Sequence, residues 1–128
     1  MEYNISMNDN VWSEIKRLNF EDLLWIIFIV TSILNIIGND CQKRYVVSNN
    51  ENYENMANNI YVFILIIVLF IYIYFFNRNY KMYKSKMDSA TNEDLVKVMG
   101  SVFFIIGTLC LLYFQVNSKN NFIGGPAI

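Results

Sequence analysis

The residue types that most often carry chemistry in proteins are scarce in this sequence. It contains no histidine, which is the commonest general base and metal ligand, and it has only two cysteines, Cys41 and Cys110. No Cys/His metal-ligand spacing exists, and no apolar stretch contains paired carboxylates, a phosphate-binding loop or a Gly-x-Ser-x-Gly turn. We therefore expect a protein that is not an enzyme and that has no catalytic residues, metal ligands or cofactor.

The polar residues inside apolar stretches are small and uncharged, and they fall on two helix faces at 100° per residue. The candidate helix-packing residues are Thr31, Ser32, Asn35, Gly100, Ser101, Gly107, Thr108 and Gln115. Small and polar side chains of this kind mediate helix association in lipid, so we predict that the first and third helices pack along these faces. The stretch Ile60–Phe76 has no Gly, Ala, Ser or Thr, and its bulky sides are expected to face lipid.

A polar seam could also line a pore or hold a ligand. Ion pathways and proton relays in membranes usually include ionisable side chains. None occurs in the apolar stretches Leu23–Gly38, Ile60–Phe76 and Val98–Val116, although Asp, Glu, Lys and Arg are 16% of the chain. This absence favours packing over conduction.

These three stretches each approach the roughly 20 helical residues that a bilayer core of about 30 Å requires. Strands are rejected because a lone strand in lipid would leave its backbone groups unpaired, and three segments cannot close a barrel. The sequence therefore predicts an all-α membrane protein with three transmembrane helices. We expect a single membrane domain, 1–128, made of an N-terminal segment 1–20, a first span 21–39, an outer loop 40–59, a second span 60–77, a basic cytoplasmic loop 78–97, a third span 98–116 and an outer tail 117–128.

Two local patterns refine this arrangement. Val11, Ile15 and Leu18 recur at helical spacing, which predicts a short N-terminal amphipathic helix on the membrane surface. Thr91 and Asp94 have the spacing of a capping box, which predicts that the third helix begins there, before Val98.

The distribution of Lys and Arg predicts the orientation. The N-terminal segment and the second loop together carry seven of these residues, and the first loop and the tail carry three. The N-terminus is therefore expected in the cytoplasm and the C-terminus outside the cell membrane. Lys43 and Arg44, which follow the first span, run against this distribution.

The second loop is a candidate lipid-headgroup site through Arg78, Lys81, Lys84 and Lys86. Each cation near an anionic surface contributes about 1 kcal/mol. The same residues also satisfy the positive-inside rule without binding any particular lipid. The net charge of the whole chain is −1, so no nucleic-acid partner is expected.

The cysteines and the tail each leave two interpretations. Cys41 follows the first span and Cys110 lies inside the third, so unpaired thiols are expected, with a disulfide as the alternative. The tail contains Gly124-Gly125-Pro126, which cannot continue a helix. It is either an unstructured end or a short docking segment on the outer face.

Four segments resemble small, uncharacterised three-helix membrane proteins of AT-rich Gram-positive bacteria. They are Asn19-Phe20-Glu21-Asp22-Leu23-Leu24-Trp25, Phe75-Phe76-Asn77-Arg78-Asn79-Tyr80, Lys97-Val98-Met99-Gly100-Ser101-Val102-Phe103 and Gly125-Pro126-Ala127-Ile128. The resemblance implies a bacterial membrane protein but implies no activity.

Two functions follow as hypotheses. The first is a non-catalytic accessory or modulatory subunit of a membrane complex, with the lipid bilayer and a larger membrane protein as partners. The second is a homo-oligomeric pore or transporter component, holin-like in size. A typical three-span holin has its N-terminus outside and a highly charged C-terminal tail, whereas this chain is expected to show the opposite of both.

Overall fold

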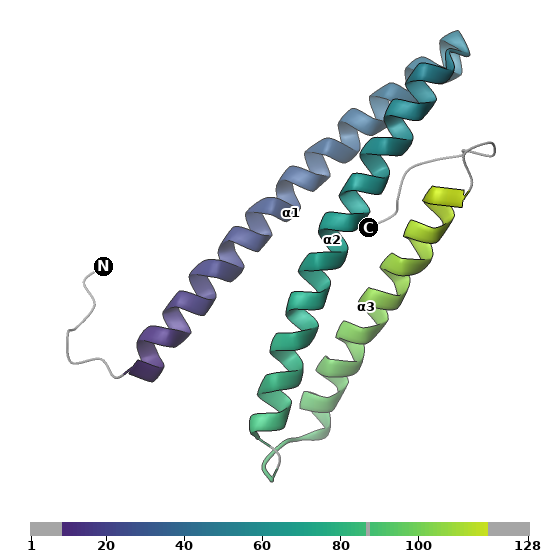
Figure 1. Cartoon of the computed structure of the whole chain (residues 1–128). Coiled ribbons are helices and arrows are strands. Elements are labelled where there is room, and N and C mark those ends of the chain that lie inside the picture. Colours follow the sequence, from purple (N-terminus) through teal and green to yellow (C-terminus); the bar gives the residue numbers. More distant parts are fainter. Residues whose placement is uncertain (1–8, 87, 118–128) are drawn as a thin grey trace. The chain divides into compact units, whose positions relative to one another are not determined.

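The computed structural model describes residues 9–86 and 88–117, which form three helices and no strand. The helices are α1 (Asp9–Ser48), α2 (Glu51–Ser85) and α3 (Asn92–Asn117) (Figure 1). Each is long and apolar enough to cross a membrane. The prediction of an all-helical chain with three such helices is confirmed, and the chain is a multi-pass membrane protein by length and composition.

The helices extend well beyond the predicted spans. At 1.5 Å per residue, the 40 residues of α1 correspond to about 60 Å and the 35 of α2 to about 52 Å. The segment expected as the outer loop, 40–59, is helical on both sides of Asn49 and Asn50. It contains neither Gly nor Pro, so nothing in it ends a helix before the turn.

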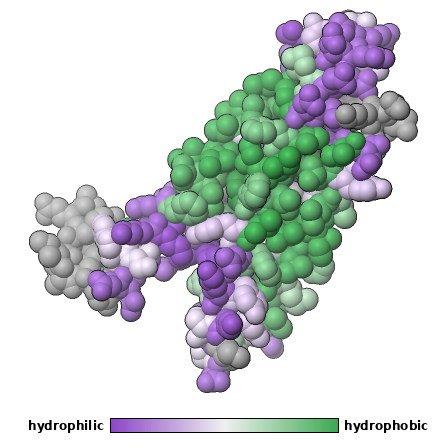
Figure 2. All heavy atoms as spheres, viewed as in Figure 1, coloured by the Kyte–Doolittle hydropathy of each residue, from purple (hydrophilic) through white to green (hydrophobic). Residues whose placement is uncertain are grey.

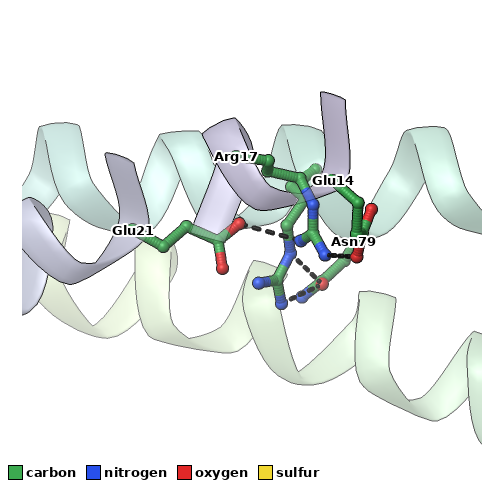
Figure 3. Close-up of polar contacts among 5 residues, drawn as sticks. Glu14, Arg17, Glu21 and Asn79 are labelled. Atoms are coloured by element: carbon green, nitrogen blue, oxygen red, sulfur yellow. Dashed lines mark hydrogen bonds and ion pairs between the residues drawn. The ribbon is translucent and has the colours of Figure 1, made fainter. Parts of the chain in front are cut away.

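The N-terminal surface helix is not a separate element, which corrects that prediction. Its residues form the first turns of α1, which continues without interruption to Ser48. No Gly or Pro separates Leu18 from the first span. Arg17 also bridges two turns, because its guanidinium bonds Glu14 and, at 2.9 Å, Glu21 (Figure 3). Ion pairs between residues three and four positions apart stabilise a continuous helix across this segment.

The turn between α1 and α2 consists of two asparagines. Asn49 has a φ of 55°, in the left-handed region that Asn tolerates better than most residues. Its N–H donates to the carbonyl of Tyr45 at 2.7 Å and closes the end of α1. Asn50 caps α2 by accepting a hydrogen bond from the N–H of Asn52 at 3.0 Å. The last turns of α1 and the first turns of α2 consequently run antiparallel.

The predicted capping box at the start of α3 is confirmed. The Asp94 N–H donates to Thr91 Oγ1 at 3.2 Å, and the Thr91 N–H donates to Asp94 Oδ2 at 3.1 Å. The hydrogen bond from the Thr91 backbone, with Lys86 Nζ 3.9 Å away, lowers the pKa of the Asp94 carboxyl, which precedes the predicted span. The negative charge at the first turn of α3 also complements the helix dipole.

Contacts divide the chain into two compact units, Met1–Val30 and Thr31–Ile128. In the second unit α2 packs along α3 (Figure 1). The most deeply buried apolar side chains lie on α2 and include Ile64, Leu65 and Val68, each fully buried. Bulky side chains such as Phe63 and Phe70 are exposed on α2, as expected, but the same helix also has a buried apolar face. Leu and β-branched residues at helical spacing can interlock without small neighbours.

The buried face of α3 repeats every seven residues through Ser101, Thr108 and Gln115. A repeat of this length keeps one side of a helix against its partner along the whole contact. The face of the molecule that Figure 2 shows is apolar along the middle of the helices and hydrophilic toward their ends. Phe70 and Phe103 are examples of large exposed side chains, in positions that lipid would cover.

α1 approaches α2 closely at Gly38. A Cβ added at Gly38 would lie 2.5 Å from a ring carbon of Tyr61, which is fully buried. The Tyr61 hydroxyl donates to Asn39 Oδ1 and, at 3.2 Å, to Gln42 Oε1. Absence of a side chain at position 38 is thus what lets the Tyr61 ring lie against α1.

Gly38→Ala is expected to destabilise the fold by about 1–3 kcal/mol, because the Tyr61 ring must move to admit the methyl group. The matched control is Gly107→Ala, since a Cβ there meets no atom within 4 Å. The control should be neutral or stabilising by up to about 1 kcal/mol, since Ala favours helix over Gly. Denaturant unfolding of both variants in detergent measures the difference. Equal stability of the two variants would contradict the close contact.

Candidate functional site: polar side chains of the apolar helices

A buried pair of amides joins α2 and α3 near the α1–α2 turn. Gln115 Nε2 donates to Asn58 Oδ1 at 3.0 Å, and the two residues are only 2% and 4% exposed. Two amides of this kind satisfy each other in a setting where water is excluded. The pair therefore fixes which turn of α3 faces which turn of α2.

A second polar network joins the same helices toward the α2–α3 turn. Asn79 Nδ2 donates to Ser101 Oγ at 2.6 Å, and Ser101 Oγ donates to the carbonyl of Lys97 at 3.0 Å. The Asn79 oxygen accepts from Arg78 Nη2 at 2.8 Å (Figure 3). The Arg78 guanidinium also lies 5.0 Å from the ring centre of Phe75. Arg78 is thereby held at the α2–α3 contact, because its guanidinium donates to Asn79 and lies against the ring of Phe75.

The predicted packing residues divide into buried and exposed groups. Thr31 and Thr108 are each 2% exposed, and Ser101 and Gln115 are also buried. Thr108 Oγ1 donates to the carbonyl of Phe104 in its own helix at 2.8 Å. Ser101 and Gln115 bond α2, whereas the sequence predicted the first helix as the partner of this face. Direct packing of the Thr31 face on the Thr108 face stays a prediction.

Gly100 and Gly107 do not serve close packing among the described residues. A Cβ added at either position would meet no atom within 4 Å. Both glycines lie on α3 beside the buried seam rather than in it. The predicted packing face of α3 therefore included two neighbouring residues, Gly100 and Gly107, that do not belong to its buried face.

Asn35 differs from the other polar residues in the spans. Its Oδ1 is buried and is the one such side-chain atom without a hydrogen-bond partner in the described part of the chain. Ser32, one turn earlier on the same face of α1, is exposed. An unpaired amide oxygen at membrane depth is costly, since no water is present to satisfy it.

The basic residues of the α2–α3 turn lie in two environments. Lys81 and Lys84 are exposed at the end of α2, while Lys86 Nζ lies 3.9 Å from Asp94. Arg78 is half-buried in the network with Asn79. Only part of the predicted headgroup set thus projects freely outward.

Both cysteines are free, as expected: Cys41 is buried and Cys110 is exposed. No group of three or more His, Cys, Asp or Glu residues is placed to hold a metal ion among the residues that the structure describes.

Several polar partners were not recognised from the sequence, namely Asn39, Gln42, Asn58, Tyr61 and Asn79. Asn58 and Asn79 lie outside the uninterrupted apolar run of α2, so they read as loop residues. Their separation of 21 residues, three seven-residue repeats, was the available signal. It places both on the face that also carries Leu65.

Comparison of the chain with known protein families, curated proteins and solved structures found no match.

Replacing Gln115 by Leu is expected to lower stability by about 1–3 kcal/mol, because the Asn58 amide is left buried and unpaired. A double-mutant cycle with Asn58→Leu should give a coupling energy of about 0.6–2 kcal/mol, the range for hydrogen bonds between membrane helices. Reversible unfolding of the four proteins in the same detergent measures it. Asn59→Leu, at an exposed neighbouring position, is the control and should show no coupling to Gln115. Additive effects of the first pair would contradict the amide contact.

Proposed function

We propose that the chain is a non-catalytic accessory or modulatory subunit of a larger membrane complex, and that α1 supplies the helix that docks its partner. The observation that carries this proposal is the unpaired Oδ1 of Asn35, with exposed Ser32 beside it. Both residues lie within the predicted first span. Asn35 as a whole is only half-buried, so a rotation of its side chain would bring this oxygen to a Ser, Thr, Asn or Gln at the same depth on a transmembrane helix of the partner.

The polar groups of the α2–α3 contact support a binding role over conduction. Asn58 bonds Gln115, and Asn79 bonds Ser101, so these side chains are turned toward each other. Thr108 bonds the backbone of its own helix. The alternative function, a homo-oligomeric pore, needs polar side chains that face a lumen. The polar side chains named above instead form hydrogen bonds inside the chain.

The proposed orientation has the N-terminus in the cytoplasm and the C-terminus outside the cell membrane, as the Lys and Arg counts favour. In this arrangement the α2–α3 turn lies at the cytoplasmic surface. Exposed Lys81 and Lys84 then contact anionic lipid headgroups, and Lys86 does so in competition with Asp94. Arg78, held by Asn79, anchors the helix end at that level.

The proposal predicts a partner that depends on α1. Tagged protein extracted from its native membrane in mild detergent should carry a larger membrane protein at fixed stoichiometry. Replacing Ser32 and Asn35 together by Leu should reduce recovery of that partner about tenfold or more, the equivalent of 1.4 kcal/mol. Quantitative mass spectrometry of the purified complex measures the recovery.

The matched control is Ile36→Leu, an exposed apolar position on the same helix, which should leave recovery unchanged. Intact mass separates the alternatives. A defined homo-oligomer without a partner would overturn the accessory role in favour of the pore. A partner retained by the Ser32/Asn35 variant would overturn the assigned docking face.

A further inference from the structure

The face of α1 that the proposed function assigns to a partner continues beyond the predicted first span. Ser32, Asn35, Asn39, Gln42 and Val46 follow one another at alternating intervals of three and four residues. This seven-residue pattern keeps one side of a helix against another helix over several turns. We call these five residues the extended α1 face, and all of them lie within the second compact unit.

The half of this face nearer the α1–α2 turn borders an open hollow of about 420 Å³. The described residues that line the hollow are Asn39, Gln42, Lys43, Val46 and Val47. Asn39 is the last residue of the predicted first span. At 1.5 Å per residue, Lys43 lies about 6 Å beyond it and the two valines about 10–12 Å beyond it. A headgroup layer is about 5–7 Å thick on each side of the bilayer core, so the valines project past it.

The two valines are apolar side chains in an aqueous setting. Val46 is 69% exposed and Val47 is 87% exposed. Lipid does not reach them at this height, and exposed apolar side chains that lie together in water mark protein contacts. Their position therefore favours a protein as the occupant of the hollow.

The polar part of the lining presents hydrogen-bond donors. The side-chain oxygens of Asn39 and Gln42 accept from the Tyr61 hydroxyl, so their NH₂ groups remain as donors. Lys43 adds a positive charge, and it forms no ion pair with any residue that the structure describes. Two amide donors and one ammonium group complement an acidic side chain on the occupant.

We propose that the partner helix that docks on Ser32 and Asn35 continues past the membrane along the extended α1 face, with an acidic side chain at Lys43 and an apolar side chain on Val46 and Val47. This inference rests on the proposed function, because it concerns the same partner. Lys43 and Val47 are four residues apart, so the acidic and apolar residues of a helical partner stand about one turn apart.

Maleimide labelling of Val47→Cys tests this inference without isolation of the partner. The labelling rate is compared between open fragments of the native membrane and the purified full-length chain, and the peptide that contains position 47 is followed by mass spectrometry. Labelling should be about tenfold or more slower in the native membrane, because the bound helix covers this position there.

Lys43→Glu in the same protein should raise the labelling rate in the native membrane about fivefold or more, because the acidic side chain of the partner is then repelled. The matched control is Arg44→Glu, the same charge reversal at the next residue. Arg44 is turned by about 100° around α1 and pairs with Asp40 at 3.2 Å. The control should leave Val47→Cys protected.

The inference is overturned if Val47→Cys is labelled equally fast in the native membrane and in the purified chain, or if its protection survives Lys43→Glu. Protection that appears when the purified chain is placed in vesicles of phosphatidylcholine and phosphatidylglycerol would assign the hollow to lipid. Each of these results leaves the proposed function standing as long as recovery of the partner depends on Ser32 and Asn35.

Protection that persists in the purified chain would also overturn the inference, because a segment of the chain itself then covers position 47. The two interpretations of the tail stay predictions, since residues 118–128 lie outside the described part of the chain. A homo-oligomer that protects Val47→Cys and contains no partner would contradict both this inference and the proposed function.

Discussion

The hydrogen bond between Gln115 and Asn58 is the interaction on which the arrangement of α2 and α3 depends. In lipid the hydrophobic effect gives no preference for one register of two apolar helices over another, because the tails are as apolar as the side chains. A slip of one turn would leave two buried amides unpaired, at a cost of several kcal/mol. The contact between Asn79 and Ser101 imposes the same condition toward the opposite turn.

α1 is held to α2 by a different principle. Gly38 admits the Tyr61 ring, whose hydroxyl then reaches Asn39, the next residue, and Gln42, one turn further along α1. At the α1–α2 turn, Asn49 and Asn50 reverse the chain within two residues. Farther along α1, Asn35 Oδ1 has no partner. We propose a docking role for α1 because it is bonded to α2 through Asn39 and Gln42, while the Asn35 oxygen lacks a hydrogen-bond partner.

Much of the architecture could be predicted because membrane spans depend on length and on the absence of charge, which are local properties. The capping box at Thr91 and Asp94 is equally local, and its geometry was predictable for that reason. The extent of α1 could not be predicted in the same way. Arg17 forms ion pairs with Glu14 and Glu21, which were assigned to the N-terminal segment and to the first span respectively. The segment 40–59 was expected to be a loop because it is polar, but polarity does not end a helix where Gly and Pro are absent.

The site could be predicted only in part. Ser101, Thr108 and Gln115 were recognised because they interrupt an apolar run. Their partners on α2 were not, because Asn58 and Asn79 lie in polar surroundings along the sequence and become buried only through contact with α3. Which helix a face meets is a tertiary property. The small residues of α3 led to the prediction that α1 is its partner, whereas Ser101 and Gln115 of α3 form their hydrogen bonds with α2.

The central claim is that polar side chains of α2 and α3 pair within one chain instead of lining a pathway. Oxidative crosslinking of Asn79→Cys with Ser101→Cys, in native membranes and with both natural cysteines replaced by Ala, tests it most directly. The account predicts a disulfide within a single chain, while a control pair at Phe70 and Phe103, both exposed, stays reduced within the chain. Crosslinks that form only between chains would contradict the account and indicate that this face belongs to an oligomer.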